Sequence, residues 1–141
     1  MSSPEVVVGR WFNEVWNERR EAAIDELMAP DAKAHGFGPE PTLGTAGFRQ
    51  IFQAFSQAFP DLRVQVVRTV REGDLILTQI HATGRHSGAG LAGPPTNRDV
   101  SFQGMVLARV QGGRIVEGWN CIDFLTMYQQ MGWVGNPVAG R

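Results

Sequence analysis

Three histidines, His35, His81 and His86, are the side chains whose ordinary pKa lies closest to neutral pH. A histidine that faces a pocket could therefore give or take a proton as a general acid or base. His35 lies in a short predicted strand before "GFG", and the alternative there is a hydrogen-bonded histidine at a strand end. His81 lies within a longer predicted strand and faces either a pocket or solvent. His86 opens a glycine-rich loop, where a structural role is favoured.

The stretch "RIVEGWNCIDF" (114–124) carries the other candidate polar groups. Side chains of a strand alternate between its two faces, so Gly118 and Asn120 share one face while Glu117 lies on the other. Asp123 directly precedes an amphipathic helix, where an aspartate accepts hydrogen bonds from free backbone N–H groups. We therefore favour a capping role for Asp123 over a role as acid or base.

Metal binding and nucleophilic catalysis find little support in these residues. The spacing of the histidines fits no zinc template, and the single cysteine, Cys121, offers no second thiolate. Cys121 has no base near it in the sequence, and the elbow of a serine nucleophile is absent. The loop 84–98 is rich in glycine but lacks the Lys-Ser/Thr ending of a phosphate-binding loop. The sequence predicts no metal site, and it predicts a wide connection at 84–98 that could also border a pocket.

Helices are predicted where apolar residues recur at helical spacing. The first and third carry aromatic stripes, which include Trp11, Trp16, Phe48 and Phe55. The predicted helices are one that begins at Ser3 and Pro4, one over 19–30 that Pro30 ends, one that Thr45 caps and Pro60 ends, and one over 123–132 that Gly132 ends.

One short strand is predicted before the third helix, and the others follow that helix, where the pattern changes to β-rich runs separated by turn residues. Helices followed by an antiparallel meander indicate an α+β domain. We expect a cone-shaped, curved antiparallel sheet with three to four helices over its concave face, enclosing an apolar pocket of the kind that binds small molecules. The chain is expected to form one domain, 1–141, with a core of about 4–132 and a tail, 133–141, that is loose or packed on a partner. The predicted strands are 31–37, 62–73, 74–86, 98–110 and 114–122.

The composition argues against several classes of partner. With 13 basic and 14 acidic residues the formal net charge is −1, so no electrostatic footprint for nucleic acid is present. No polybasic run suggests a membrane surface, and neither a leader peptide nor a membrane-spanning run is found. A lone cysteine requires no oxidising compartment. A soluble cytoplasmic protein is the expectation.

The sequence resembles the SnoaL-like polyketide cyclases, a branch of the nuclear-transport-factor-2-like superfamily that also contains ketosteroid isomerase. The resemblance covers about Pro4 to Gly132. It implies the same cone of helices and curved sheet, a homodimer through the sheet, and chemistry without a cofactor on a polycyclic or carbonyl-bearing substrate. The segments that carry it are "FPDL" (59–62), "GRHSGAGLAGPPTNR" (84–98) and "GGRIVEGWNCIDFLTMYQQMG" (112–132).

The resemblance also carries over particular positions. Cyclases of this family use an aspartate near the end of the last strand as acid and base in an aldol closure, and that position falls on Asn120. A histidine one strand earlier falls near Val106, whereas His35 matches a histidine found in the first strand of many members. Asp123 matches the acidic residue that begins the last helix. The replacement of both polar groups argues against an aldol closure by the family's usual route.

The resulting hypothesis is a cyclase or isomerase-type lyase that removes a proton next to a carbonyl. An amide cannot take that proton at neutral pH, but it can donate to an enolate oxygen, so His35 is the expected base and Asn120 the expected donor. The other expected ligand contacts are Trp11, Trp16, Phe48, Phe55, His81, Val106 and Gly118.

Two alternatives stay open. A hydroxylase-like or epoxide-opening enzyme would need a carboxylate in the pocket, from Asp74, Asp99 or Asp123. A non-catalytic binding protein would need none, and the missing aspartate at Asn120 favours it.

Overall fold

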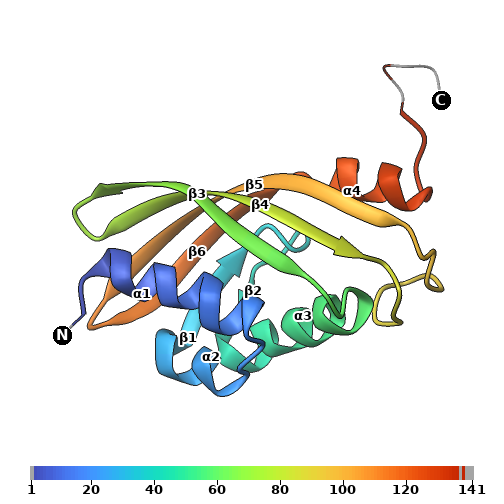
Figure 1. Ribbon diagram of the computed structural model, residues 1–141. Coiled ribbons are helices and arrows are strands. Elements are labelled where there is room, and N and C mark those ends of the chain that lie inside the picture. The colour runs from blue at the N-terminus through green and yellow to red at the C-terminus, as the bar shows by residue number, and fades with distance from the viewer. Residues whose placement is uncertain (1, 137, 139–141) are drawn as a thin grey trace.

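The computed structural model describes residues 2–136 and residue 138. A six-stranded sheet lies above four helical elements, and a fifth follows the last strand (Figure 1). The elements in chain order are α1 (Pro4–Arg10), the π-helical segment η1 (Trp11–Asn17), α2 (Ala22–Leu27), β1 (Met28–His35), β2 (Thr42–Leu43), α3 (Gly44–Ala58), β3 (Arg63–Glu72), β4 (Leu75–Arg85), β5 (Asp99–Gln111), β6 (Arg114–Ile122) and α4 (Phe124–Met131).

The strand order is β2-β1-β6-β5-β4-β3, so the first long strand pairs with the last. The strands β3 to β6 form the predicted antiparallel meander, with β4 and β5 paired along their length. The α+β class and the helix-covered sheet are confirmed. Two features were not predicted, namely the parallel pairing of β1 with β6 and the short strand β2.

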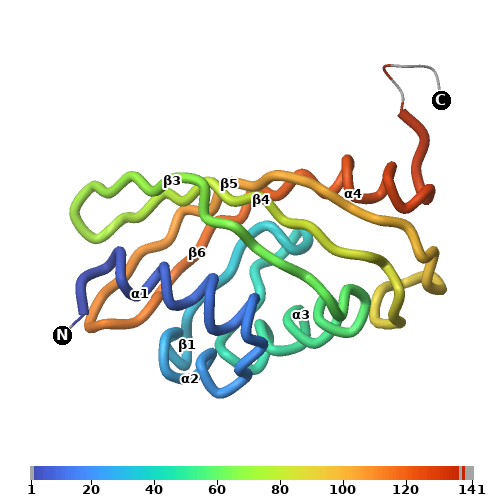
Figure 2. The backbone as a smooth tube through the Cα atoms, in the orientation of Figure 1, coloured from blue at the N-terminus to red at the C-terminus, as the bar shows by residue number. Residues whose placement is uncertain are grey.

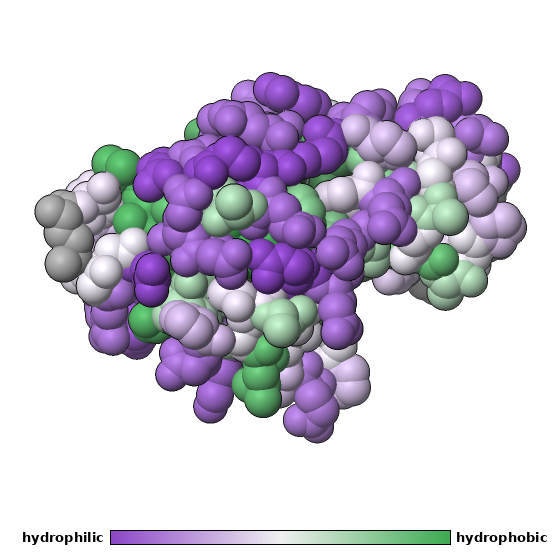
Figure 3. Space-filling model, turned by 90° about the horizontal axis from the view of Figure 1, so that it is seen from below, coloured by the Kyte–Doolittle hydropathy of each residue, from purple (hydrophilic) through white to green (hydrophobic). Residues whose placement is uncertain are grey.

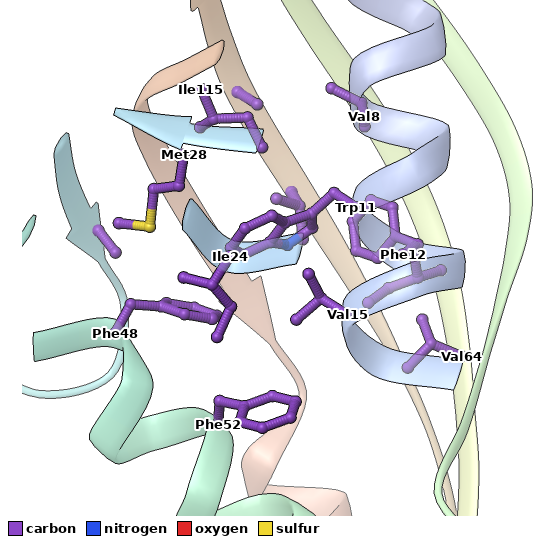
Figure 4. Close-up of a cluster of buried hydrophobic side chains, with 14 of the residues drawn as sticks. Val8, Trp11, Phe12, Val15, Ile24, Met28, Phe48, Phe52, Val64 and Ile115 are labelled. Atoms are coloured by element: carbon purple, nitrogen blue, oxygen red, sulfur yellow. The ribbon is translucent and has the colours of Figure 1, made fainter. Parts of the chain in front are cut away.

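The first helix changes its winding partway along. The Ser3 hydroxyl accepts from the backbone N–H of Val6 at 3.4 Å and caps α1, as predicted. From Trp11 the chain continues as a π-helix, in which each N–H donates to the carbonyl five residues earlier. Trp11 and its neighbour Phe12 are both buried beneath the sheet (Figure 4), so the wider turn directs two adjacent aromatic rings into the interior.

Two predicted helix boundaries are wrong. Pro30 does not end α2, which stops at Leu27, because the chain has already entered β1. Proline has no N–H for a strand partner, and Pro30 lies where the pairing of β1 with β6 shifts register between Met28 and Lys33. Thr45 does not cap α3, which begins one residue earlier without a side-chain cap.

The core lies between the helices and the concave face of the sheet. Its centre contains Phe12, Val15, Ile24 and Phe52, drawn with their neighbours in Figure 4. The helix side of the molecule is mainly hydrophilic on its outside, with hydrophobic residues in scattered spots (Figure 3). Within the described part of the chain, every helix is too short or too polar to cross a lipid bilayer.

A cluster of four charged side chains ties η1 to α2. Glu14 accepts from Arg10 Nε at 2.5 Å and from Arg20 Nη2 at 2.6 Å, and Arg20 Nη1 also contacts Glu26 at 2.7 Å. The hydrogen bonds from Arg10 and then Arg20 lower the pKa of Glu14 from 4.5 to about 2.

Glu14→Gln removes the charge that pairs with Arg10 and Arg20, so it is expected to lower the free energy of unfolding at pH 7. The expected loss is only about 1–2 kcal/mol, because solvent screens a partly exposed ion pair. A lowered native pKa stabilises the fold fully above the ordinary pKa of 4.5, and the effect is lost as the pH falls through about 2. The measurement is urea denaturation at pH 7 and at several pH values below 4.5. The difference in the free energy of unfolding between variant and wild type should shrink as the pH falls. Glu5→Gln, which removes an exposed pair with Arg71, is the matched control and should stay within about 0.5 kcal/mol. A difference that does not change with pH would contradict the assignment.

Candidate functional site

An apolar cavity of about 70 Å³ lies between the sheet and the helices. Among the lining residues that the structure describes, Asn120 has the only amide side chain, and none is ionisable. The lining consists of Trp11, Phe12, Trp16, Phe37, Phe48, Phe55, Leu62, Val64, Ile80, Ala82, Phe102, Val106, Asn120, Ile122 and Phe124.

The helical side of the cavity is an aromatic cluster. The ring centroids of Trp11 and Phe48 are 4.9 Å apart, and those of Trp16 and Phe48 are 5.9 Å apart with the planes at 78°. Such tilted and edge-to-face pairs are favourable ring geometries. Phe55 contacts Trp16 about two turns farther along α3, so the expected ligand contacts from η1 and α3 all line the cavity.

The sheet side of the cavity follows the alternation of the strands. Every second residue faces inward, which brings Ile80 and Ala82 of β4, Phe102 of β5, and Asn120 of β6 to the lining. Val106 also lines the cavity and is the register partner of Asn120. The orientation predicted for Asn120 from the alternation of "RIVEGWNCIDF" therefore agrees with the structure.

The amide of Asn120 has a fixed orientation. Its Nδ2 donates to the backbone carbonyl of His35 at 2.9 Å. Because a carbonyl oxygen only accepts, the NH2 group must point to it, which leaves the second N–H and Oδ1 for other partners. Gly118 lies two residues away and borders a second hollow of about 40 Å³, which Val106 and Asn120 also line. A donor is thus presented at an otherwise apolar wall.

The side chain of His35 lies on the opposite face of the sheet. Its Nε2 is 2.6 Å from Glu117 Oε2, and its ring stacks on Trp119 with centroids 5.5 Å apart. The parallel register pairs His35 with Trp119, so the side chains of both point away from Asn120. The prediction that the His35 side chain reaches the pocket as a base is therefore wrong. Only the backbone carbonyl of His35 contacts Asn120.

The other two histidines also lie outside the cavity. His81 Nε2 is 2.7 Å from Ser101 Oγ on the outer face of β4, because the residues on either side of His81 face inward. His81 therefore does not line the cavity, and the prediction that it contacts the ligand is wrong. His86 is fully buried, and its Nδ1 accepts from the backbone N–H of Thr96 at 3.2 Å. Burial lowers the pKa of His86, in keeping with the structural role favoured from the sequence.

The carboxylates that an epoxide-opening enzyme would require lie elsewhere. Asp74 accepts from Gln111 at 3.0 Å and from Arg109 at 2.9 Å, and these contacts, Gln111 first, lower its pKa. Asp99 lies 3.6 Å from Arg85. Neither lines the cavity, and no group of three or more histidine, cysteine or acidic side chains suited to a metal ion occurs among the described residues.

Asp123 caps α4, as the sequence predicts. Its Oδ2 accepts from the Thr126 hydroxyl at 2.6 Å, and its Oδ1 accepts from the Thr126 backbone N–H at 3.0 Å. Both bonds favour the charged form and lower the pKa of Asp123. Its carboxylate is therefore engaged at the helix start and does not line the cavity.

Asp123→Ala is expected to lower the free energy of unfolding by about 1 kcal/mol, because two donors at the start of α4 lose their acceptor. Thermal or urea denaturation would measure it. Asp123→Asn keeps a capping oxygen. It should lower the free energy of unfolding by only about a few tenths of a kcal/mol, because asparagine and aspartate are similarly good N-cap residues. Equal losses in the two variants would argue against the cap.

Nine of the described lining residues were not among the predicted site residues, and three of them show why. Phe102 shares its strand face with Val106, so the alternation within β5 could have identified it. Phe124 directly follows the capping Asp123, and its place at the cavity depends on the direction in which α4 leaves the sheet. Phe37 ends the predicted strand 31–37, but β1 stops at His35 and Phe37 lies in the irregular segment that follows.

Comparisons with known proteins agree with this architecture. The family model described as SnoaL-like polyketide cyclase matches residues 6–131. IdmH, a candidate polyketide cyclase from Streptomyces antibioticus, is 31% identical over 93% of this chain and 99% of its own, with a TM-score of 0.80. A candidate SnoaL-like polyketide cyclase from Jannaschia sp. CCS1 is 23% identical over 91% of this chain and 90% of its own, with a TM-score of 0.84.

A third solved structure shares the fold alone. It is a protein with a ketosteroid isomerase-like fold from Catenulispora acidiphila, in complex with trimethylamine, which is 17% identical over 94% of this chain and 96% of its own, with a TM-score of 0.75. No match was found among proteins with curated functions. Through the family match and the similarity to IdmH, the chain belongs to the SnoaL-like polyketide cyclase family and has the nuclear-transport-factor-2-like fold shared with ketosteroid isomerase.

Proposed function

We propose that the cavity binds a flat, apolar small molecule and that Asn120 donates its second N–H to a carbonyl oxygen of that ligand. The single observation that carries the proposal is the amide of Asn120, held by the His35 carbonyl at the wall of an otherwise apolar cavity. A few fixed polar groups in an apolar pocket are the usual means of orienting a small ligand.

The proposed chemistry is a cyclase or isomerase-type reaction that passes through an enolate. An N–H donor that is already in place stabilises negative charge as it forms on the carbonyl oxygen, and it does so most strongly where water is excluded. Because none of the described residues that line the cavity is ionisable, the proton that leaves the carbon next to the carbonyl passes to a water molecule or to a basic oxygen of the ligand itself. The protein contributes orientation, exclusion of bulk water and carbonyl polarisation.

The family membership supports a reaction on a polyketide-like compound, and IdmH is similar enough in sequence to add to that support. The candidate hydroxylase AclR from Streptomyces galilaeus has a TM-score of 0.82 but only 22% identity, so it supports the fold alone.

A second candidate function is binding without catalysis. The observation that favours it is the same apolar lining, in which no side chain of a described residue is a base that could take a proton. For a binding protein, ligand affinity would survive the change Asn120→Asp and no compound would be transformed.

We also propose a homodimer formed through the outer face of the sheet. Leu77 and Met105 lie on this face and are 40% and 45% exposed. Exposed apolar side chains on a sheet face are typical of an interaction surface. Sedimentation analysis of the wild type and of Met105→Lys would test this assembly separately from the reaction.

The bicyclic ketone 2-tetralone in heavy water is a suitable probe of the proposed function. We expect binding to shift the side-chain amide signals of Asn120, and we expect the protein to accelerate deuterium incorporation next to the carbonyl. A shift without acceleration would favour the binding protein. Amide signals that do not move at saturating ketone would contradict both candidates.

A further inference from the structure

A groove of about 490 Å³ lies outside the cavity, bordered by the segment after β1, by α3, by the loop after β4 and by α4. The loop after β4 lies beside the end of α3 (Figure 2). A Cβ on Gly88 would come within 1.8 Å of the Gln57 carbonyl oxygen, which shows how closely the loop backbone approaches the helix. The groove is lined by Gly36, Phe37, Gly38, Thr42, Gly47, Gln50, Ile51, Ala54, Phe55, Leu91, Phe124 and Tyr128.

Three phenylalanines line both the groove and the cavity, namely Phe37, Phe55 and Phe124. The ring of Phe124 lies 6.2 Å from that of Phe37 and is stacked 5.8 Å from that of Phe55, centroid to centroid. Each ring comes from a different element, and each is only half-buried. The wall between the two spaces is therefore made of side chains and contains rings that rotation about a side-chain bond could move.

The volumes of the two spaces favour movement of this wall when a ligand binds. An apolar cavity of about 150 Å³ holds one benzene, and ligand pockets are commonly about 300–1,000 Å³. The cavity of about 70 Å³ is smaller than either, whereas the groove of about 490 Å³ is within the second range. A ring that is to reach Asn120 therefore needs more space than the cavity offers, and displacement of the wall would join the cavity to the groove.

We propose that the groove is the entrance to the cavity and that Phe37, Phe55 and Phe124 form its gate. This inference rests on the proposed function, because it assumes that a ligand reaches Asn120. With the gate open, the leading ring of the ligand lies against Asn120 and the rest lies in the groove, where Gln50 and Tyr128 offer polar groups. The gate residues then determine which ring systems enter.

The first test blocks the groove. In a Cys121→Ser background, which removes the native exposed thiol, Gln50→Cys is labelled with a bulky maleimide. Binding of 2-naphthol is followed by stopped-flow quenching of tryptophan fluorescence, since Trp11 and Trp16 line the cavity. We expect the label at position 50 to slow association at least tenfold. Gln53→Cys, labelled in the same way on the same helix but outside the groove lining, is the matched control and should change the rate less than twofold.

The second test widens the gate. Phe124→Ala is expected to speed association of 2-naphthol about tenfold, because its ring no longer has to move aside. Leu125→Ala, an exposed neighbour on α4 that lines neither space, should leave the rate unchanged. If Phe124→Ala fails to fold, Phe124→Leu removes the aromatic ring while keeping an apolar side chain, and it should give a smaller increase in the same direction.

The outcomes separate the gate from the proposed function. If 2-naphthol binds and shifts the Asn120 amide signals, but either the label at position 50 or the change at Phe124 leaves its association rate unchanged, the gate is overturned and the binding cavity stands. If 2-naphthol binds neither the wild type nor the variants, both proposals are overturned. Slower association with the label and faster association in the variant would together establish the gate.

Discussion

Asn120→Leu is expected to lower the rate of proton exchange on a bound ketone about a hundredfold. Leucine has a similar size but no N–H, so the enolate oxygen loses the donor proposed to stabilise it. Removing one such donor from an enzyme site costs about 100- to 1,000-fold in rate, or about 3–4 kcal/mol of barrier. The measurement is deuterium incorporation into 2-tetralone at saturating protein. Asn120 also supplies the hydrogen bond to the His35 carbonyl, so the variant should unfold about 1–3 kcal/mol more easily.

The control for this prediction is Ile122→Leu, a change at a neighbouring lining residue that alters shape without altering polarity. Its exchange rate should stay within a few fold of the wild type. If folded Asn120→Leu exchanges the ketone as fast as the wild type does, Asn120 has no part in the reaction. If neither protein exceeds the rate in buffer, the family fold serves here as a binding protein.

Gly36→Ala is expected to destabilise the fold by about 3 kcal/mol or more, which is among the larger effects of a single substitution. A Cβ at this position would lie 1.9 Å from the Asn120 backbone oxygen, which is impossible without moving β1 away from β6. The backbone angle φ is +103°, a conformation that side chains rarely adopt and that adds strain. Urea denaturation of the purified variant, or its failure to accumulate in folded form, would measure the effect.

Gly118→Ala is the matched control for Gly36→Ala. Its Cβ would meet its nearest neighbours, including Asn120 Nδ2, only at 3.9 Å, and its φ is not positive. It should change the free energy of unfolding by less than about 1 kcal/mol, which is the usual range for a substitution without a clash. Equal stability of the Gly36 and Gly118 variants would show that the contact between Gly36 and Asn120 is not tight.

Local patterns predicted the parts of the site that depend on a single element. The alternation of residues in β6 was enough to direct Asn120 inward, and the stripes on the first and third helices identified Trp11 and Phe48. Capping chemistry was enough to assign Asp123 to the start of α4. Each of these signals depends on residues that are close together in the sequence.

The position of His35 could not be obtained in the same way. Its direction depends on the parallel register between β1 and β6, and that register sets it beside Trp119 on the outer face. Phe37 lies in an irregular segment just after β1. Pro30 lies within β1, although proline after a helical pattern usually marks the end of the helix. In all three cases a contact with a distant part of the chain outweighs the local preference.

The side-by-side placement of β1 and β6 has a consequence for biosynthesis. The amide of Asn120 donates to the carbonyl of His35, and these two residues lie far apart in the sequence. During synthesis on the ribosome, Asn120 is therefore added long after His35 and near the end of the domain. Helices made early have only a partial sheet to cover until β6 inserts between β1 and β5. Pairings between such remote segments close slowly and leave apolar surface uncovered meanwhile. A nascent chain that stalls before β6 should therefore be a target for chaperones.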